Sequence, residues 1–126
     1  MKKHLLFAIF VLVAGAFRGN AQSLQNTVWK AYINGPNDTV TLHIGKDTSF
    51  VTMGAGDMVV VKSICRVSKD TLSLQDFEGQ YLCPDGTGVY LYTVTAEKLV
   101  LKMVNDPCDG RATAINGVAW TRVSKP

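Results

Sequence analysis

The amino-acid sequence predicts an all-β protein, folded as an eight-stranded up-and-down antiparallel barrel. Eight short extended segments are separated by turns rich in Gly, Asn and Asp, and the one weak helix candidate is a turn near Cys108–Ile115. Polar and apolar residues alternate along several segments, as they do in strands with one buried face. A closed barrel removes exposed strand edges, and eight strands enclose room for packed side chains or one small ligand. A β-sandwich is the alternative.

Turn residues delimit the expected strands. In chain order, the strands are expected at Thr27–Asn34, Thr39–Ile44, Ser49–Met53, Met58–Val67, Thr71–Gln75, Val89–Thr95, Lys98–Val104 and Val118–Val123. Alternation is clearest in the second and seventh segments. The first four segments are followed by Gly35-Pro36-Asn37-Asp38, Gly45-Lys46-Asp47, Gly54-Ala55-Gly56-Asp57 and Ser68-Lys69-Asp70. A tight turn, Thr95-Ala96-Glu97, makes the sixth and seventh segments an antiparallel hairpin.

Residues 1–21 are predicted to be a signal peptide. Lys2 and Lys3 precede an apolar stretch from Leu5 to Phe17, and Gly19-Asn20-Ala21 supplies the small residues that a signal peptidase reads. The apolar stretch is shorter than the roughly 20 residues of a membrane-spanning helix. Cleavage is expected after Ala21, leaving one barrel domain over residues 22–126. We expect this domain to be exported, to the periplasm or beyond, with no membrane attachment.

The charge balance argues against nucleic acid as a partner. The chain has 13 Lys+Arg and 10 Asp+Glu, but three of the basic residues lie in the predicted signal peptide, which leaves 10 against 10. A balanced domain offers no electrostatic attraction to nucleic acid or to an anionic membrane surface. We expect a monomer of one small domain.

Three cysteines remain after the predicted cleavage. In an up-and-down barrel, successive connections alternate between the two ends, so Cys83 in the fifth connection and Cys108 in the seventh share one end. Cys65 lies beside the fourth connection, at the other end. Because a disulfide needs Cα atoms within about 7 Å, the sequence predicts a Cys83–Cys108 bridge and a buried free thiol at Cys65. Cys65 is expected to share its strand face with Val59, Val61 and Val67.

The first and last strands of a closed barrel are neighbours. Trp29 begins the first strand, while Trp120 and Arg122 lie on the last. Antiparallel order therefore places Arg122 beside Trp29, where a guanidinium over the indole would form a cation–π contact that closes this end. We interpret Arg122 as structural.

A series of short motifs resembles the small secreted bacterial lipocalin-like domain proteins, which are β-barrels of the calycin type. The motifs are Trp29-Lys30, Gly88-Val89-Tyr90-x-Tyr92, Lys98-Leu99, Asp106-x-Cys108-x-x-Arg111 and Gly117-x-x-Trp120, and the resemblance covers nearly the whole mature chain. It implies a barrel with a cavity, open at one end, for a small apolar molecule. It also favours an inward orientation of Tyr90 and Tyr92, which the alternation leaves open. The first strand carries Thr27-Val28-Trp29 where a typical lipocalin has Gly-x-Trp.

Two readings fit the acidic segment around Cys108. Asp85, Asp106 and Asp109 would supply oxygen ligands to Ca²⁺ if the disulfide gathered them, although their spacing matches no calcium loop. In the other reading, which we favour, the aspartates cap turns, and Arg111 is held structurally by Asp106 or Asp109. We therefore expect no metal.

The sequence predicts no catalytic residue and no cofactor. His43 is the one histidine left after cleavage and is expected to face outward, and no Cys/His zinc signature is present. The serines lack a nucleophile-elbow setting. Asp76 and Glu78 lie close together but fit the exit from a strand.

The sequence therefore predicts an exported, non-catalytic protein that binds a small hydrophobic or amphipathic molecule inside the barrel. Burial of apolar surface would drive binding. The alternative is a filled barrel that binds a protein partner, or inhibits one, through loops such as Gly54–Asp57 and Gln80–Gly88. The expected ligand-binding residues are Trp29, Ala31, Leu42, Leu72, Leu74, Tyr90, Tyr92, Leu99, Leu101 and Trp120.

Overall fold

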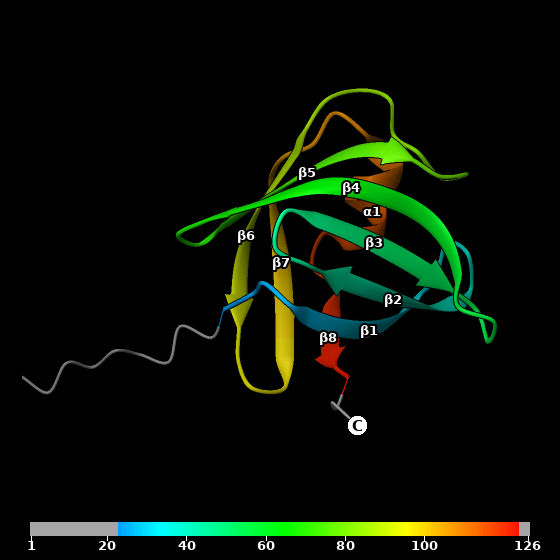
Figure 1. Ribbon diagram of the computed structural model, residues 1–126, viewed down its shortest axis with the longest axis horizontal. Helices are drawn as coiled ribbons and strands as arrows, with labels where there is room; N and C mark the ends of the chain where they lie inside the picture. Colours follow the sequence, from blue (N-terminus) through cyan, green and yellow to red (C-terminus); the bar gives the residue numbers. More distant parts are fainter. Residues whose placement is uncertain (1–22, 124–126) are drawn as a thin grey trace, which may run out of the picture.

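The protein folds as a closed barrel of eight antiparallel strands in up-and-down order (Figure 1). The computed structural model describes residues 23–123, so the predicted signal peptide lies outside the described residues. The elements are β1 (Thr27–Ile33), β2 (Asp38–Ile44), β3 (Thr48–Met53), β4 (Met58–Ser68), β5 (Thr71–Glu78), β6 (Gly88–Val94), β7 (Lys98–Asn105), α1 (Asp109–Ile115) and β8 (Ala119–Arg122).

The predicted fold class and strand order are confirmed. The barrel closes where β1 pairs with β8, with Trp29 opposite Arg122 as expected. The helix candidate is present as α1, the single helix in the described part of the chain. The largest change in bounds is in β5, which continues past Gln75 to Glu78. Among residues 23–123 no helix has the length and apolar character to cross a membrane.

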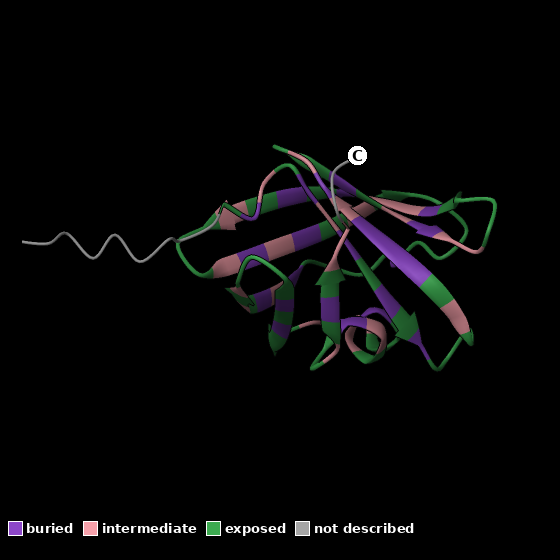
Figure 2. Cartoon of the chain, turned by 90° about the horizontal axis from the view of Figure 1, so that it is seen from below, coloured by how far each residue is buried: buried purple, intermediate pink, exposed green. Residues whose placement is uncertain are grey.

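Buried and exposed residues alternate along the strands, which form the banded pattern of Figure 2. The inward side chains make one continuous core. Trp29, Leu72, Tyr90, Leu99 and Leu101 are completely buried within it. The remaining buried members are Leu24, Ala31, Ile33, Val40, Leu42, Ile44, Cys65, Leu74, Ile115 and Trp120.

Three β-bulges interrupt the alternation. The pairing registers shift at Val60 on β4, at Phe77 on β5 and at Val104 on β7. A bulge adds one residue to a strand, so the residues beyond it change face. Val60 is therefore buried, while Val59, expected on the inner face, is 44 % exposed. The expectation for Val59 was wrong because periodicity assumes an unbroken ladder.

The two ends of the barrel differ. The closed end holds the β2–β3, β4–β5 and β6–β7 turns and is sealed by Leu24 and Trp29, both almost fully buried. The open end holds the β1–β2 and β3–β4 turns, the long 79–87 connection and α1. β8 is too short to reach the open end, and α1 lies there instead, attached to the edge of β7 through Gly117 N–H, which donates to Leu101 O at 2.8 Å (Figure 1).

Candidate functional site

A cavity of about 490 Å³ lies inside the open half of the barrel. Strands β1 to β5 supply most of its wall, and the β1–β2 turn, the 79–87 connection and α1 surround its mouth. Most of the wall is apolar. The lining residues are Ile33, Gly35, Pro36, Val40, Leu42, Ser49, Val51, Met53, Val60, Val61, Ser63, Leu74, Asp76, Tyr81, Cys83, Gly110, Arg111, Ala114, Ile115 and Trp120.

The predicted ligand-binding residues divide between this cavity and the packed core. Leu42, Leu74 and Trp120 line the cavity. Tyr92 packs against the core, half-buried, and its hydroxyl donates to Lys69 O near the closed end. The others, Trp29, Ala31, Leu72, Tyr90, Leu99 and Leu101, belong to the core and are not among the lining residues. Whether any of them contacts a ligand remains a prediction.

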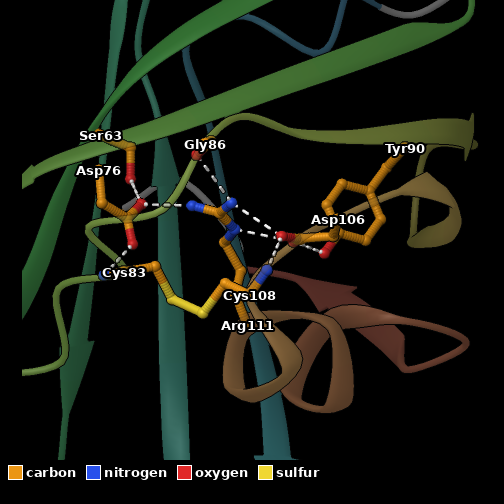
Figure 3. A network of polar contacts seen from close by, with 8 residues as sticks. All are labelled: Ser63, Asp76, Cys83, Gly86, Tyr90, Asp106, Cys108 and Arg111. Atoms are coloured by element: carbon orange, nitrogen blue, oxygen red, sulfur yellow. Dashed lines mark hydrogen bonds and ion pairs between the residues drawn. A yellow bond between two sulfur atoms is a disulfide. The ribbon is translucent and has the colours of Figure 1, made fainter.

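Arg111 lies at the centre of a buried polar cluster beside the cavity (Figure 3). Its Nε donates to Asp106 Oδ2 and its Nη2 to Asp106 Oδ1, both at 2.8 Å, which makes a bidentate ion pair. Nη2 also donates to Gly86 O at 3.3 Å. Tyr90 adds a hydroxyl hydrogen bond to Asp106 Oδ2. Of the two aspartates that the sequence offered to Arg111, the structure selects Asp106.

Asp76 forms the side of the cluster that faces the cavity. Its Oδ1 lies 3.3 Å from Arg111 Nη1, an ion pair without hydrogen-bond geometry, and accepts from Ser63 Oγ at 2.6 Å. Its Oδ2 accepts from the Cys83 amide at 3.0 Å. We call Ser63, Asp76, Tyr90, Asp106 and Arg111 the Arg111 cluster.

The cluster fills a gap in the sheet. β5 pairs with β6 up to Leu74, opposite Gly88, and beyond this point β5 continues without β6. Arg111 spans the gap, from Asp76 on β5 to Asp106 at the end of β7. Gly88 is needed there, because a Cβ on it would lie 2.5 Å from Asp106 Oδ2 and 2.9 Å from Arg111 Nε. The side-chain cluster thus replaces backbone pairing at the open end.

Burial and the Asp106–Arg111 ion pair shift the pKa values of Asp106, Arg111 and Tyr90. Burial alone would raise the pKa of Asp106, but the hydrogen bonds from Arg111, Tyr90 and the Cys108 amide outweigh it and hold this pKa below its usual range. Burial would lower the pKa of Arg111, and the two carboxylates keep it raised. Burial and the hydrogen bond to Asp106 raise the pKa of Tyr90. Asp106 and Arg111 therefore keep their charges at neutral pH.

The predicted disulfide is confirmed. Cys83 and Cys108 are bridged, with their Cα atoms 6.0 Å apart, and the bridge ties the 79–87 connection to the start of α1. Cys65 is a buried free thiol at the closed half, as predicted, and burial raises its pKa to about 11, with a further contribution from Asp47. Both outcomes follow from the alternation of connections between the two ends.

The geometry does not support the hypothesis that Asp85, Asp106 and Asp109 bind Ca²⁺. Asp85 and Asp109 are exposed, and both carboxylate oxygens of Asp106 are bonded to Arg111. Within residues 23–123 no group of three His, Cys, Asp or Glu side chains is placed to hold a metal ion.

Sequence reasoning missed Asp76 and Ser63 as members of the site. The signal was present: Asp76 continues the inward series of Leu72 and Leu74 on β5, and a carboxylate on a buried face requires a partner. The side chain of Asp76 is 4 % exposed, whereas that of Glu78, beyond the Phe77 bulge, is 62 % exposed. The bulge separates two carboxylates that look equivalent in the sequence.

No protein-family model matches the sequence, and no curated protein or solved structure matches it either. The structure alone therefore defines the class of protein. It is an all-antiparallel, eight-stranded β-barrel, consistent with a calycin-like fold, with a disulfide and a buried ion-pair cluster at its open end.

Proposed function

We propose that this protein is an exported, non-catalytic binding protein of the lipocalin type, which holds a small hydrophobic or amphipathic molecule inside the barrel. The observation that carries the proposal is the apolar cavity of about 490 Å³, which has a size typical of small-molecule sites. Each 100 Å² of apolar ligand surface removed from water would contribute about 2.5 kcal/mol. The disulfide supports export, because such bridges persist in oxidising compartments.

The neutral fluorescent probe N-phenyl-1-naphthylamine tests the proposal directly. Its emission rises when it enters an apolar site, so titration of the purified, oxidised protein should give saturable binding of one probe per chain. Val51→Phe should block the cavity, because Val51 lines the cavity and the larger phenylalanine ring would fill it with apolar atoms. We expect this variant to stay folded, with an unchanged or raised melting temperature, and to lose probe affinity by roughly tenfold or more.

Val100→Phe is the matched control. Val100 lies on the outer face of β7 and is 39 % exposed, so the same enlargement there leaves the cavity untouched. If the wild-type protein binds no probe, or if both variants bind it equally well, the binding proposal is wrong. Export is tested separately: the N-terminal sequence of the protein recovered outside the cytoplasm should begin at Gln22.

A protein-binding role is the second candidate. It is favoured by exposed apolar side chains near the open end, where Phe77, Tyr81 and Leu82 are 50 %, 55 % and 40 % exposed. Affinity capture by the wild-type protein should then recover a partner in equal stoichiometry, and Phe77→Ser with Leu82→Ser should release it. If this double variant loses the partner but still binds the probe, the exposed surface binds the partner independently of the cavity.

A further inference from the structure

The charged groups beside the cavity are already paired with one another. Asp76 and Arg111 are the two charged side chains among the described lining residues, and Asp106 lies directly behind Arg111. The guanidinium is bound by two carboxylates, and Asp76 also accepts from Ser63 and from the Cys83 amide. A ligand that reaches this part of the wall, which we call the charged pole, therefore meets charges that are already ion-paired, and Arg111 Nη1 is the one guanidinium nitrogen among these described residues without a hydrogen bond.

The net charge of Asp76, Asp106 and Arg111 is negative. Two carboxylates and one guanidinium leave one net negative charge in a site where the three side chains are 4 %, 0 % and 6 % exposed. A carboxylate headgroup would add a second negative charge where little water screens it. An ammonium headgroup would lose its hydration while lying against Arg111, and Asp76 already has its own donors. A charged headgroup of either sign is therefore disfavoured.

Uncharged polar side chains also line the cavity, and they favour an uncharged polar group on the ligand. Trp120 is buried and lines the cavity, and its Nε1–H has no acceptor among the described residues. Such a donor costs free energy until an oxygen accepts from it. Ser49 on β3 and Ser63 on β4 also line the cavity, and Ser63 donates its hydroxyl proton to Asp76. A hydroxyl or carbonyl oxygen of the ligand can accept from Trp120 Nε1–H without bringing a charge into the barrel.

From these contacts we infer that the cavity selects uncharged amphiphiles, such as long-chain alcohols, and discriminates against carboxylates and amines of the same length. The inference rests on the proposed binding function. Within that function it specifies the chemical class of the ligand: an apolar chain with a neutral oxygen at its end.

Competition by three matched compounds tests the inference. Dodecanol, dodecanoate and dodecylammonium share one chain and differ in charge at about pH 8. Dodecanol is used below its solubility limit, and the two charged compounds below their micelle concentrations, to displace N-phenyl-1-naphthylamine. We expect dodecanol to displace the probe at a concentration roughly tenfold lower than either charged compound. If dodecanoate or dodecylammonium competes as well as dodecanol, or if dodecanol does not compete, the inference is wrong while probe binding still supports the function. If neither the probe nor any of the compounds binds, the function and the inference fail together.

Asp76→Asn identifies the source of the selectivity. The substitution removes the net negative charge. The new amide oxygen can accept from the Cys83 amide, and the new NH2 group can donate to Ser63 Oγ. Dodecanoate should gain at least about threefold relative to dodecanol. Glu78→Gln is the control, because it removes a carboxylate two residues away that is exposed and faces Lys62. An equal gain in both variants would show that general surface charge, and not the charged pole, sets the preference, and would overturn the inference.

Discussion

The closed and open ends of the barrel are built from the same eight strands but are stabilised in different ways. At the closed end large side chains fill the interior, and Arg122 lies over the Trp29 ring at 4.6 Å from its centroid. At the open end all three β-bulges of the described residues occur, and a buried ion-pair cluster and a disulfide hold the elements together. Apolar packing closes one end, and polar and covalent links leave room at the other.

The difference shows how a small barrel can keep a cavity. Filling both ends with apolar side chains would be the simplest route to stability, since close packing leaves few voids. Here Arg111 spans the gap between β5 and β6 and forms ion pairs with Asp76 on β5 and Asp106 beyond β7, so side chains connect the strands where their backbones no longer pair. We infer that the Arg111 cluster and the bridge maintain the shape of the open end.

Removal of Arg111 should have the largest effect. Arg111→Ala leaves Asp106 and Asp76 buried without their cation, which typically costs about 3–5 kcal/mol of unfolding free energy. Urea denaturation at neutral pH measures the loss. Arg111→Lys keeps the charge but not the two parallel hydrogen bonds, so it should fall between alanine and wild type.

Arg66→Ala is the control for this change. Arg66 is exposed on the outer face of β4, and its removal should alter stability by less than about 0.5 kcal/mol. Equal losses at Arg66 and Arg111 would contradict a structural role for the cluster.

Loss of the disulfide should rank next. The bridge joins residues 25 positions apart, and on the chain-entropy model a loop of this size contributes roughly 3 kcal/mol. Replacing Cys83 and Cys108 by serine should lower the urea midpoint accordingly, and it should weaken probe binding because both segments border the cavity mouth. A double variant with the stability and probe affinity of the oxidised protein would show that the ion pairs alone maintain the open end.

The closed end should depend on Arg122 to a smaller degree. A cation–π contact contributes about 0.5–2 kcal/mol depending on its solvation, so Arg122→Ala should cost about 1 kcal/mol. The emission of Trp29 should also change as water reaches the ring, while probe binding should be preserved. Lys30→Ala, at a neighbouring exposed position on β1, should leave stability and emission unchanged. Loss of probe binding in Arg122→Ala would contradict the independence of the two ends.

Acid should weaken the open end through Asp106. Because the folded-state pKa of this group is lowered, the unfolded chain takes up the proton first as pH falls past its ordinary value of about 3.9. The stabilisation is complete above that value and is lost as pH falls through the folded-state pKa. Unfolding free energies measured from pH 6 to pH 2 should decline in this window. Asp106→Asn should flatten the decline, and Glu78→Gln, at an exposed carboxylate, should leave it as in wild type.

The closed end could largely be predicted from the sequence, because it obeys the local rules without interruption. Strand alternation and the up-and-down order sufficed to place Arg122 beside Trp29 and to separate Cys65 from the other two cysteines. The same order predicted the Cys83–Cys108 bridge at the opposite end.

The open end could be predicted only in part, because its geometry depends on bulges and on side-chain contacts between distant elements. The alternation placed Val59 inside, where Val60 lies, and gave no reason to separate Asp76 from Glu78. The sequence offered two aspartates as partners of Arg111. The structure places Asp109 at the exposed start of α1 and Asp106 against the guanidinium. The cavity depends on the bulges and on the contacts of Arg111, and neither can be predicted from the local alternation of residues.

Cys65 offers the most sensitive test of the sealed end, where we expect no reaction in the folded protein. Its side chain lies in the core, and its raised pKa of about 11 leaves about one thiolate in a thousand at pH 8. Iodoacetamide should therefore leave the native protein unlabelled for hours and modify one thiol per chain once urea unfolds it, as mass spectrometry can count. Rapid labelling without denaturant would mean that the closed end opens to solvent. The closed end would then not be sealed, and the thiol would report on motion in the packed half of the barrel.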